Sequence, residues 1–296
     1  MTSTQTLGGS TIAAAVGVDP YCSPIRLWLD MIHGREREES EAMRWGTRLE
    51  PLIIDEVESL GYIVRRETLF EYVDDEREWL IGHPDAFVLD DGDYSRPPSA
   101  VLEVKTANQW AARANGPIPI NYQAQAQTYM HLTNTNRALL ATLVGGQRLE
   151  LHELARSQHA IDTLLTLAER FMRYVCEREQ PPPQGHPDDR AALLEAWPDA
   201  VPKSKRENAE VREARLTLSS LLEREKHWRE NVEGCRAVIT SHMGDADTLT
   251  DHDDVTVATW RNVSSTRLDA KRLREEKPDI YEQYTTETTT RRFVLT

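Results

Sequence analysis

The first 180 residues alternate between stretches with the hydrophobic period of a helix and stretches with that of a strand. Apolar residues spaced by three or four positions indicate helices, and short runs rich in Val, Ile and Leu indicate strands. Helices are expected between Ser10 and Gly17, between Ser23 and Gly34, and over residues 41–60, 122–132 and 157–179. Strands are expected over residues 62–72, 78–90, 100–105, 138–144 and 148–154. This mixture predicts an α/β domain.

The chain changes character after residue 180. The prolines at 181–183 cannot continue a helix, so we place the end of a first domain, residues 1–180, at this point. Residues 181–203 are interpreted as a linker that contains a short helix. Residues 204–296 are expected to form an appendage, in which one long helix precedes a small α+β module. The expected strand and helix of that module cover residues 255–260 and 268–276.

The long helix of the appendage carries apolar side chains in a strict three-four spacing, which is typical of a coiled-coil seam. The seam consists of Val211, Ala214, Leu218, Leu221, Trp228, Val232, Cys235 and Ile239. Glu225 interrupts it once. Self-association, binding of a partner and packing back on the first domain all fit this pattern, and the sequence does not choose among them.

Two of the expected strands carry residues suited to catalysis. Gly82-His83-Pro84-Asp85 lies on one, and Leu102-Glu103-Val104-Lys105 lies on the next. Alternate side chains of a strand share a face, so Glu103 and Lys105 point the same way. Pairing of the two strands as a hairpin brings Asp85 opposite Glu103. Two carboxylates at that distance repel each other unless they share a proton or bind a cation, and Lys105 beside them favours the cation.

Magnesium is the cation that these residues fit. Mg²⁺ prefers oxygen ligands and keeps several waters, and Asp85, Glu103 and the Val104 backbone carbonyl offer oxygens. Mn²⁺ is expected to substitute. Such an ion polarises a phosphodiester and activates a water, while Lys105 can orient that water or neutralise developing charge. The pattern predicts phosphodiester hydrolysis. An ordinary solvated strand is the alternative, because the pattern is short and the chain holds 49 acidic residues.

Two expected helices carry polar residues that can complete such a site. Glu50 lies on a flank of the helix over residues 41–60, beside its apolar stripe. The helix that begins near Tyr122 carries Gln125 and Gln127, whose amides can donate to phosphate oxygens. Glu50 therefore joins the candidates for the acidic site, and the two glutamines join the candidates for DNA contact.

The order of these motifs resembles the YqaJ-like viral recombinase family, which includes the phage lambda exonuclease and belongs to the PD-(D/E)XK nucleases. The resemblance covers roughly residues 7–180. It rests on Gly8-Gly9-Ser10, Pro20-Tyr21, Ser23-Pro24, Leu27-Trp28, Trp45-Gly46-Thr47, Glu50-Pro51, His83-Pro84-Asp85, Glu103-Val104-Lys105 and Tyr122 with Gln125-Ala126-Gln127. It implies a restriction-endonuclease-like core, in which helices flank a mixed central sheet.

The resemblance also implies roles for individual residues. The metal ligands that it implies are Asp85, Glu103 and the Val104 carbonyl, with Glu50 in the same acidic cluster. Lys105 corresponds to the catalytic lysine.

Contacts to the DNA phosphates are implied for Ser10, Gln125 and Gln127. Many relatives also carry an arginine before the Gly-Gly-Ser segment, whereas no basic side chain precedes Ser10 here. Arg44 and Arg48 are candidate substitutes because they lie one helical turn apart near Glu50. Solvated helix arginines are the alternative interpretation of these two residues.

The resemblance implies a magnesium-dependent exonuclease that hydrolyses linear double-stranded DNA from its ends, in the 5′–3′ direction, and leaves single strands for a phage-type annealing protein. A homo-oligomeric ring, with a trimer as one size, would keep such an enzyme on its track. Two alternatives stay open. One is a structure- or site-selective endonuclease of the same fold, and the other is a non-catalytic DNA-binding or assembly protein.

Composition narrows these functions. The net charge of −14 disfavours broad electrostatic binding of DNA, so DNA would have to be held locally. Three cysteines without CxxC or CxH spacing disfavour a zinc site, a disulfide framework and a four-cysteine iron–sulfur cluster. No apolar run approaches about eighteen residues and no signal peptide is recognisable. We therefore expect a cytoplasmic protein with no membrane partner, and the resemblance implies a phage or prophage protein in a bacterial host.

Overall fold

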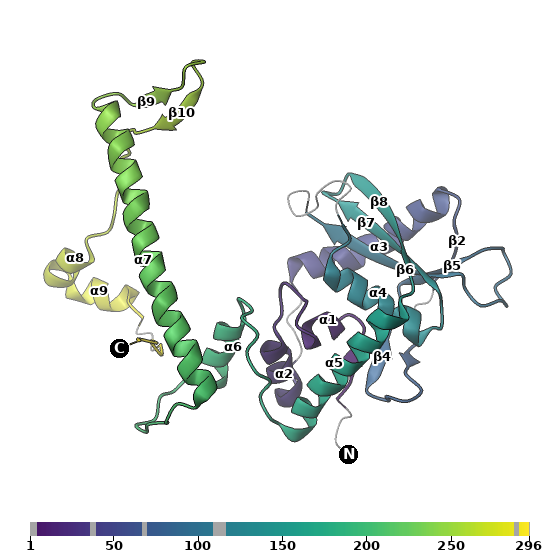
Figure 1. Cartoon of the computed structure of the whole chain (residues 1–296). Coiled ribbons are helices and arrows are strands. Elements are labelled where there is room, and N and C mark those ends of the chain that lie inside the picture. Colours follow the sequence, from purple (N-terminus) through teal and green to yellow (C-terminus); the bar gives the residue numbers. More distant parts are fainter. Residues whose placement is uncertain (1–4, 36–39, 67–69, 109–116, 287–289, 296) are drawn as a thin grey trace. The chain divides into compact units, whose positions relative to one another are not determined.

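A computed structural model describes residues 5–35, 40–66, 70–108, 117–286 and 290–295. The chain divides into two compact units, Met1–Trp197 and Pro198–Thr296 (Figure 1). The division follows Trp197, whereas the proline run suggested a boundary at residue 180. The helix α6 (Asp189–Ala196) accounts for the difference, because its Ala192 belongs to a hydrophobic core of the first unit.

The first unit is built on a five-stranded sheet with the order β2-β5-β6-β7-β8 (Figure 1). Its strands are β2 (Ile63–Arg66), β5 (Ala86–Leu89), β6 (Ala100–Ala107), β7 (Arg137–Val144) and β8 (Arg148–Ala155). β6 and β7 run parallel, and the other neighbours run antiparallel. A parallel pair needs a crossover, which α4 (Ile120–Leu132) provides. The mixed α/β class expected from the sequence is confirmed.

Both faces of this sheet are covered by helices. On one face, Val57 of α3 (Glu41–Ser59) lies in the same core cluster as Leu102. On the other face, Met130 of α4 packs with Val101. A strand that is buried on both faces carries a nearly continuous hydrophobic run, and the first five residues of β6 are indeed all buried. Glu103 is thus a charged side chain within a core layer, beneath α4.

The strands expected over residues 62–72 and 78–90 are each divided between two sheets. One end of each expected strand belongs to the five-stranded sheet, and the other end belongs to a separate three-stranded sheet of order β1-β4-β3. Its strands are β1 (Leu7–Gly8), β3 (Tyr72–Val73) and β4 (Leu80–Gly82). Between β4 and β5 lie His83, Pro84 and Asp85. Proline has no N–H for a strand ladder, so the chain changes sheets at the residues that the sequence marked for catalysis.

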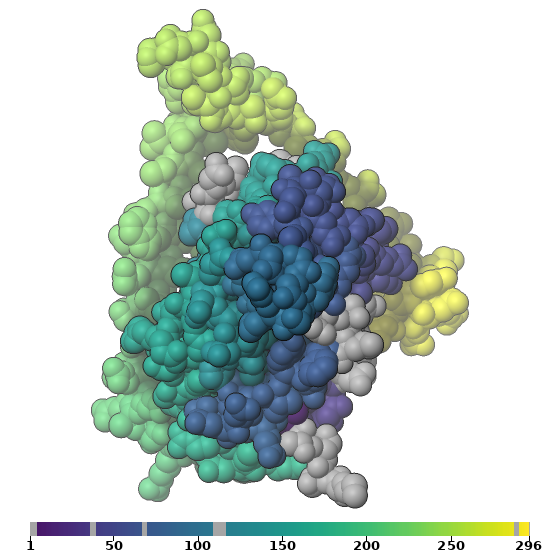
Figure 2. All heavy atoms as spheres, turned by 90° about the vertical axis from the view of Figure 1, so that its right-hand side faces the viewer, coloured from purple at the N-terminus to yellow at the C-terminus, as the bar shows by residue number. Residues whose placement is uncertain are grey.

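A second core of the first unit lies among α1, α2, α5 and α6. The first three helices are α1 (Ile12–Ala15), α2 (Pro24–His33) and α5 (Gln158–Glu177). Ser23 caps α2 by accepting a hydrogen bond from the Arg26 N–H, and Gly34 ends the helix with a φ of 60°. Figure 2 shows the β2 side of this unit, where α3, β2 and the segment that follows β5 (blue) form much of the surface.

The second unit consists of a long helix followed by short elements. They are α7 (Ala209–Met243), β9 (Thr248–Thr250), β10 (Thr256–Thr259), α8 (Ala270–Glu276) and α9 (Pro278–Tyr284). The long helix expected from Val211 is present. β9 and β10 form an antiparallel pair, of which the sequence analysis found only the second strand. Met243 is the one buried residue in the described part of this unit. None of the described helices of the chain is both long and apolar enough to cross a membrane.

Candidate active site

The acidic residues of the candidate site lie where β5 begins and β6 passes beside it. Ala86 pairs with Leu102 in the antiparallel register, and the continuation of that register sets Asp85 beside Glu103. The Asp85 Oδ2 accepts a hydrogen bond of 2.7 Å from the Val104 N–H. This bond fixes the Asp85 carboxylate against β6 just after Pro84 has turned the chain out of β4.

Glu103 is the centre of this arrangement. Its side chain is only 1% exposed. Its Oε1 accepts hydrogen bonds from the Lys105 ammonium and, at 2.7 Å, from the Gln125 amide. Its Oε2 is buried without a hydrogen-bond partner among the residues that the structure describes. A buried carboxylate oxygen with no donor is costly, so this atom has an unused capacity to bind a cation.

Acidic side chains gather around Glu103. The pKa of Glu103 is raised to about 8, chiefly by burial, with Lys105 lowering it and Asp85 and Glu50 raising it. Burial also raises the pKa of Asp85, while Lys105 and the Val104 N–H lower it. The pKa of Glu50 is raised by burial and then by Asp85. A cation at this position would favour the charged form of all three carboxyls.

Lys105 supplies the positive charge of the site. Burial alone would lower the pKa of its ammonium, but Glu103 and Asp85 outweigh burial and raise it. The Lys105 Nζ also lies 5.6 Å from the centroid of the Tyr122 ring, a cation–π contact. The sequence analysis used Tyr122 only as the start of a helix and did not find this contact.

The structure brings Gln125 to the acidic residues through a network that includes Tyr129. The Gln125 Nε2 donates to the Glu103 Oε1 and lies 3.1 Å from the Tyr129 hydroxyl. The ring of Tyr129 fits against Gly9 and Gly82, where a Cβ would come within 2.2 Å and 3.0 Å of its carbons. Tyr129 was not found by the sequence analysis. The available signal was its spacing of four residues from Gln125, which places both on one face of α4.

Gln127 lies apart from this network. Its Nε2 donates to the carbonyl of Ala155, and its Oε1 accepts from the Ser157 N–H, both at 2.9 Å. The Gln127 amide therefore joins the end of β8 to the start of α5. If Gln127 contacts DNA as predicted, its amide must first break the hydrogen bonds to Ala155 and Ser157.

The remaining predicted DNA contacts lie on the surface. Ser10 is exposed in the turn that precedes α1. Arg44 and Arg48 are exposed on the first half of α3. The Arg44 guanidinium lies 4.0 Å from the Glu41 carboxylate, and the Arg48 guanidinium lies 5.6 Å from the centroid of the Trp45 ring. Both arginines are accessible, and the contacts they make are with neighbours on their own helix.

A divalent ion at Glu103 would depend on few protein ligands. Among the described residues, no three His, Cys, Asp or Glu side chains converge closely enough to hold a metal ion alone. The oxygens available are those of Asp85 and Glu103, with Glu50 nearby. This donor set fits Mg²⁺, which often takes one or two carboxylates and keeps its other ligands as water or substrate oxygens.

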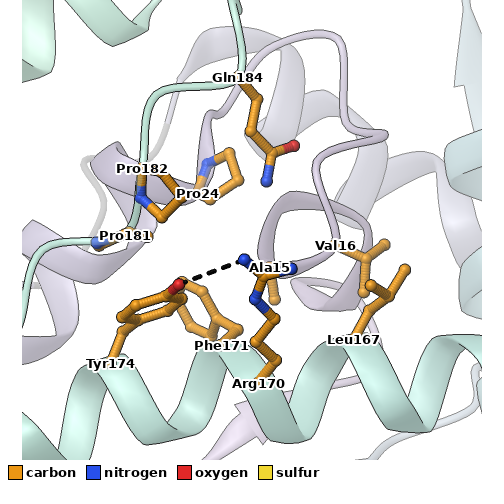
Figure 3. Close-up of a pocket in the computed structure, with 10 residues that line it drawn as sticks. All are labelled: Ala15, Val16, Pro24, Leu167, Arg170, Phe171, Tyr174, Pro181, Pro182 and Gln184. Carbon is orange, nitrogen blue, oxygen red and sulfur yellow. Dashed lines mark hydrogen bonds between the residues drawn. The ribbon is translucent and has the colours of Figure 1, made fainter. Parts of the chain in front are cut away.

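A hollow of about 50 Å³ lies away from the acidic residues (Figure 3). Pro181 and Pro182 line it opposite Phe171 and Tyr174 of α5, and the Arg170 guanidinium donates to the Tyr174 hydroxyl at 3.5 Å. None of the predicted site residues lines it. At this hollow, Pro181 and Pro182 pack against α5 of the first unit. This packing explains why the first unit continues beyond residue 180.

Residues 3–136 match the family model of the YqaJ-like viral recombinase domain. The chain is 23% identical over 300 residues to the uncharacterized protein YqaJ of Bacillus subtilis (strain 168), with 97% of this chain and 90% of that protein covered. It is also similar to a crystal structure of an alkaline exonuclease (LHK-Exo) from Laribacter hongkongensis, with 19% identity, a TM-score of 0.49, and 64% of this chain and 95% of that chain covered. A phage related exonuclease from Haemophilus somnus 129PT gives 14% identity, a TM-score of 0.46, and coverage of 58% and 94%.

Proposed function

We propose that the protein is a metal-dependent deoxyribonuclease that degrades linear double-stranded DNA from an end. The match of residues 3–136 to the YqaJ-like viral recombinase domain, the family that the order of motifs resembles, supports this proposal. One observation carries the proposal. The Glu103 carboxylate is buried with one oxygen unpartnered among the described residues, between Asp85, Lys105 and Gln125. A structural carboxylate would have its oxygens satisfied, whereas a metal ligand needs a free one.

A PD-(D/E)XK core is part of this proposal. The sequence Pro84-Asp85, followed by Glu103-Val104-Lys105, has the residue types of that motif. Their placement, with Asp85 just before β5 and Glu103 beside it within β6, in a mixed sheet with helices on both faces, supports the assignment. The antiparallel pairing of β5 with β6 is what joins the two halves of the motif.

In this proposal, Mg²⁺ or Mn²⁺ is held by Asp85, Glu103 and the Val104 carbonyl, with Glu50 completing the acidic cluster. A divalent ion there would polarise the scissile phosphate and lower the pKa of a water. Lys105 remains an ammonium, because the carboxylates beside it raise its pKa. Its charge can orient the attacking water and neutralise negative charge that develops on the phosphate.

Gln125 and the surface residues contribute binding and orientation. The Gln125 amide holds the Glu103 Oε1, which leaves the Oε2 of the same carboxylate for the ion. Ser10, Arg44 and Arg48 are proposed to contact DNA phosphates. Local contacts of this kind suit a chain with a net charge of −14, because the protein lacks the overall positive charge that would attract DNA broadly.

The family resemblance supports the finer parts of the proposal. These parts are digestion in the 5′–3′ direction, single-stranded products for a phage-type annealing protein, and a homo-oligomeric assembly on the DNA. An enzyme of this type would act on DNA ends in the bacterial cytoplasm during phage recombination.

The test is digestion of matched DNA substrates with Mg²⁺, with Mn²⁺ and with a chelator. The substrates are a linear duplex with and without a 5′ phosphate, each labelled at either end, and a closed circle. We expect metal-dependent release of nucleotides from the linear duplex alone. Nicking of the closed circle would instead identify an endonuclease, and metal-independent DNA binding without cleavage would identify a non-catalytic protein.

A matched pair of variants separates a failed site from a misfolded protein. Glu103→Gln removes the charge of the buried carboxylate in the site. Asp74→Asn removes the charge of another buried carboxylate, which lies outside the candidate site. The proposal requires that digestion is lost in the first variant and retained in the second.

A further inference from the structure

Lys105 is the one lysine among residues 1–202, where the other strongly basic side chains are all arginines. The ammonium of a lysine is a point charge on a flexible stem, whereas the planar guanidinium of an arginine is oriented by its own shape. The Lys105 side chain is 20% exposed, so water reaches only part of it. The position of the ammonium therefore depends on the groups that surround it.

Two groups of different kinds hold the Lys105 ammonium. The Glu103 carboxylate accepts a hydrogen bond from it. The ring of Tyr122 lies on another side, with its centroid 5.6 Å from the Lys105 Nζ. A carboxylate that binds a divalent ion attracts a neighbouring ammonium less, because the ion neutralises its charge. The attraction between the ammonium and the neutral ring does not depend on that charge.

The position of Tyr122 follows from the way α4 lies over β6. Side chains three or four residues apart share one face of a helix, and Tyr122, Gln125 and Tyr129 have this spacing in α4. Glu103 and Lys105 share the face of β6 that α4 covers. Gln125 contacts Glu103, and Tyr122, one turn nearer the start of α4, contacts Lys105. The Tyr122 ring is half-buried against the core beneath α4, so the fold fixes its place.

We propose that Tyr122 is a positioning residue, whose ring keeps the Lys105 ammonium in the site when Glu103 gives its charge to a divalent ion. The role rests on the proposed nuclease function and deepens it. A lysine that loses its carboxylate partner and has no other contact can swing towards solvent, where it cannot orient a water or face the phosphate. A catalytic group that is held in place avoids this loss.

Two substitutions separate the ring of Tyr122 from its hydroxyl. Tyr122→Leu removes the aromatic face but keeps an apolar side chain. The rate of digestion at saturating DNA should fall about threefold to thirtyfold, the equivalent of one cation–π contact. The KM for DNA should change by less than about twofold, because the contact is made to Lys105 and not to DNA. Tyr122→Phe keeps the aromatic face and should restore the rate to within about twofold of wild type.

Tyr62→Leu is the matched control for the loss of a tyrosine. Tyr62 is also half-buried and packs against a different core cluster of the first unit. Its substitution removes the same atoms without touching Lys105. The rate of digestion should stay at the wild-type value at a temperature where the variant is folded.

NMR of the lysine side chains reads the contact without measuring activity. The chain holds six lysines, so selective labelling gives a simple spectrum, and the signal missing in Lys105→Arg identifies Lys105. Ring currents shift protons that lie over an aromatic face upfield. Wild type and Tyr122→Phe should show this upfield shift of the Lys105 side chain both without and with Mg²⁺, and Tyr122→Leu should lack it.

Several results would overturn this role of Tyr122. Wild-type digestion by Tyr122→Leu would leave the ring only a packing role, and a raised KM with an unchanged maximal rate would make Tyr122 a DNA contact. Equal slowing of Tyr122→Phe and Tyr122→Leu would assign the effect to the hydroxyl. Loss of the upfield shift of Lys105 on addition of Mg²⁺ would show that the ring does not hold the ammonium. A wild-type chain that digests no DNA would instead refute the proposed nuclease function, and this role with it.

Discussion

Two buried carboxylates of the first unit, Glu103 and Asp74, differ in how their oxygens are satisfied. Asp74 is 7% exposed and accepts hydrogen bonds from the His131 ring, from the Glu76 N–H at 3.0 Å and from the Arg77 guanidinium at 3.4 Å. Burial alone would raise its pKa, but the bonds from His131 and Glu76, together with the charges of His131 and Arg77, lower it. The pKa of Glu103 is raised instead, to about 8.

The same helix provides a partner for each carboxylate. α4 contributes the neutral amide of Gln125 to Glu103 and the imidazole of His131 to Asp74. Asp74 is thereby satisfied, and its bonds join the β3–β4 turn to the end of α4. Glu103 lies among Asp85 and Glu50 and keeps an oxygen that no described residue binds. Asp74 therefore stabilises the fold through satisfied hydrogen bonds, whereas Glu103 keeps the unpartnered oxygen that the proposed cation site requires.

The largest expected effect is that of Glu103→Gln. The change keeps the shape of the side chain and one oxygen that can accept from Lys105 and Gln125, but it replaces the second oxygen with an amide and removes the charge that a metal ion needs. We expect DNA digestion to fall by at least about 10²–10³-fold, the range seen when a single electrostatic contact to a transition state is lost. Thermal unfolding should show little loss of stability, because the substitution relieves the repulsion from Asp85. Wild-type activity in this variant would refute the proposed role of Glu103.

Asp74→Asn should give the converse result. The asparagine can still accept from the Glu76 N–H but loses its charged interactions with His131 and Arg77. We expect the free energy of unfolding to fall by about 1–3 kcal/mol, measured by urea titration, with digestion within about twofold of wild type at a temperature where both proteins are folded. The loss should be greatest near neutral pH and shrink in acid, because the contribution of a lowered pKa disappears once the carboxyl is protonated in the folded state. A variant as inactive as Glu103→Gln would abolish the distinction between the two carboxylates.

The alternation of side chains along a strand explains why part of the site could be predicted. A strand has a period of two, so Glu103 and Lys105 had to share a face, and a hairpin register had to bring Asp85 near them. The order of motifs then added Gln125 and Gln127 as candidates. Burial of β6 on both faces could not be predicted in the same way, because it depends on α3 and α4 arriving from distant parts of the chain.

The contacts of α4 show where sequence reasoning fails. Gln125 and Gln127 are two residues apart, so their side chains project in directions about 200° apart around the helix. Only one of them can face Glu103, and the sequence does not say which. Tyr129 escaped notice because its position depends on Gly9 and Gly82, which belong to two other segments. The apolar residues of α5 and α7 have the same three-four spacing, yet those of α5 are buried and those of α7 are largely exposed, because burial depends on what packs against a helix.

The pH dependence of stability should become weaker when metal is added. The pKa of Glu103 lies near 8 in the folded chain and near 4.5 in the unfolded chain. Between these values only the unfolded chain releases the proton, so the Glu103 contribution to stability falls as pH rises through this window. Mg²⁺ favours the charged carboxylate, so its stabilising effect should grow with pH, to about 1.4 kcal/mol at ten times its dissociation constant. Urea titrations of wild type and Glu103→Gln, with and without Mg²⁺, measure both trends. Equal Mg²⁺ stabilisation of the two proteins would place the ion elsewhere.

The smallest expected effect concerns the network that holds Gln125. Tyr129→Phe keeps the ring that packs against Gly9 and Gly82 but removes the hydroxyl beside the Gln125 amide. The amide can then reorient, and Glu103 loses a fixed donor at its Oε1. One neutral hydrogen bond contributes about 0.5–1.5 kcal/mol, so digestion should slow by about threefold to tenfold at saturating DNA. Tyr94→Phe, at an exposed tyrosine in the β5–β6 loop, is the matched control and should not change the rate. Equal digestion rates of Tyr129→Phe and Tyr94→Phe would show that Tyr129 acts only through packing and that its hydroxyl is not needed to hold the Gln125 amide.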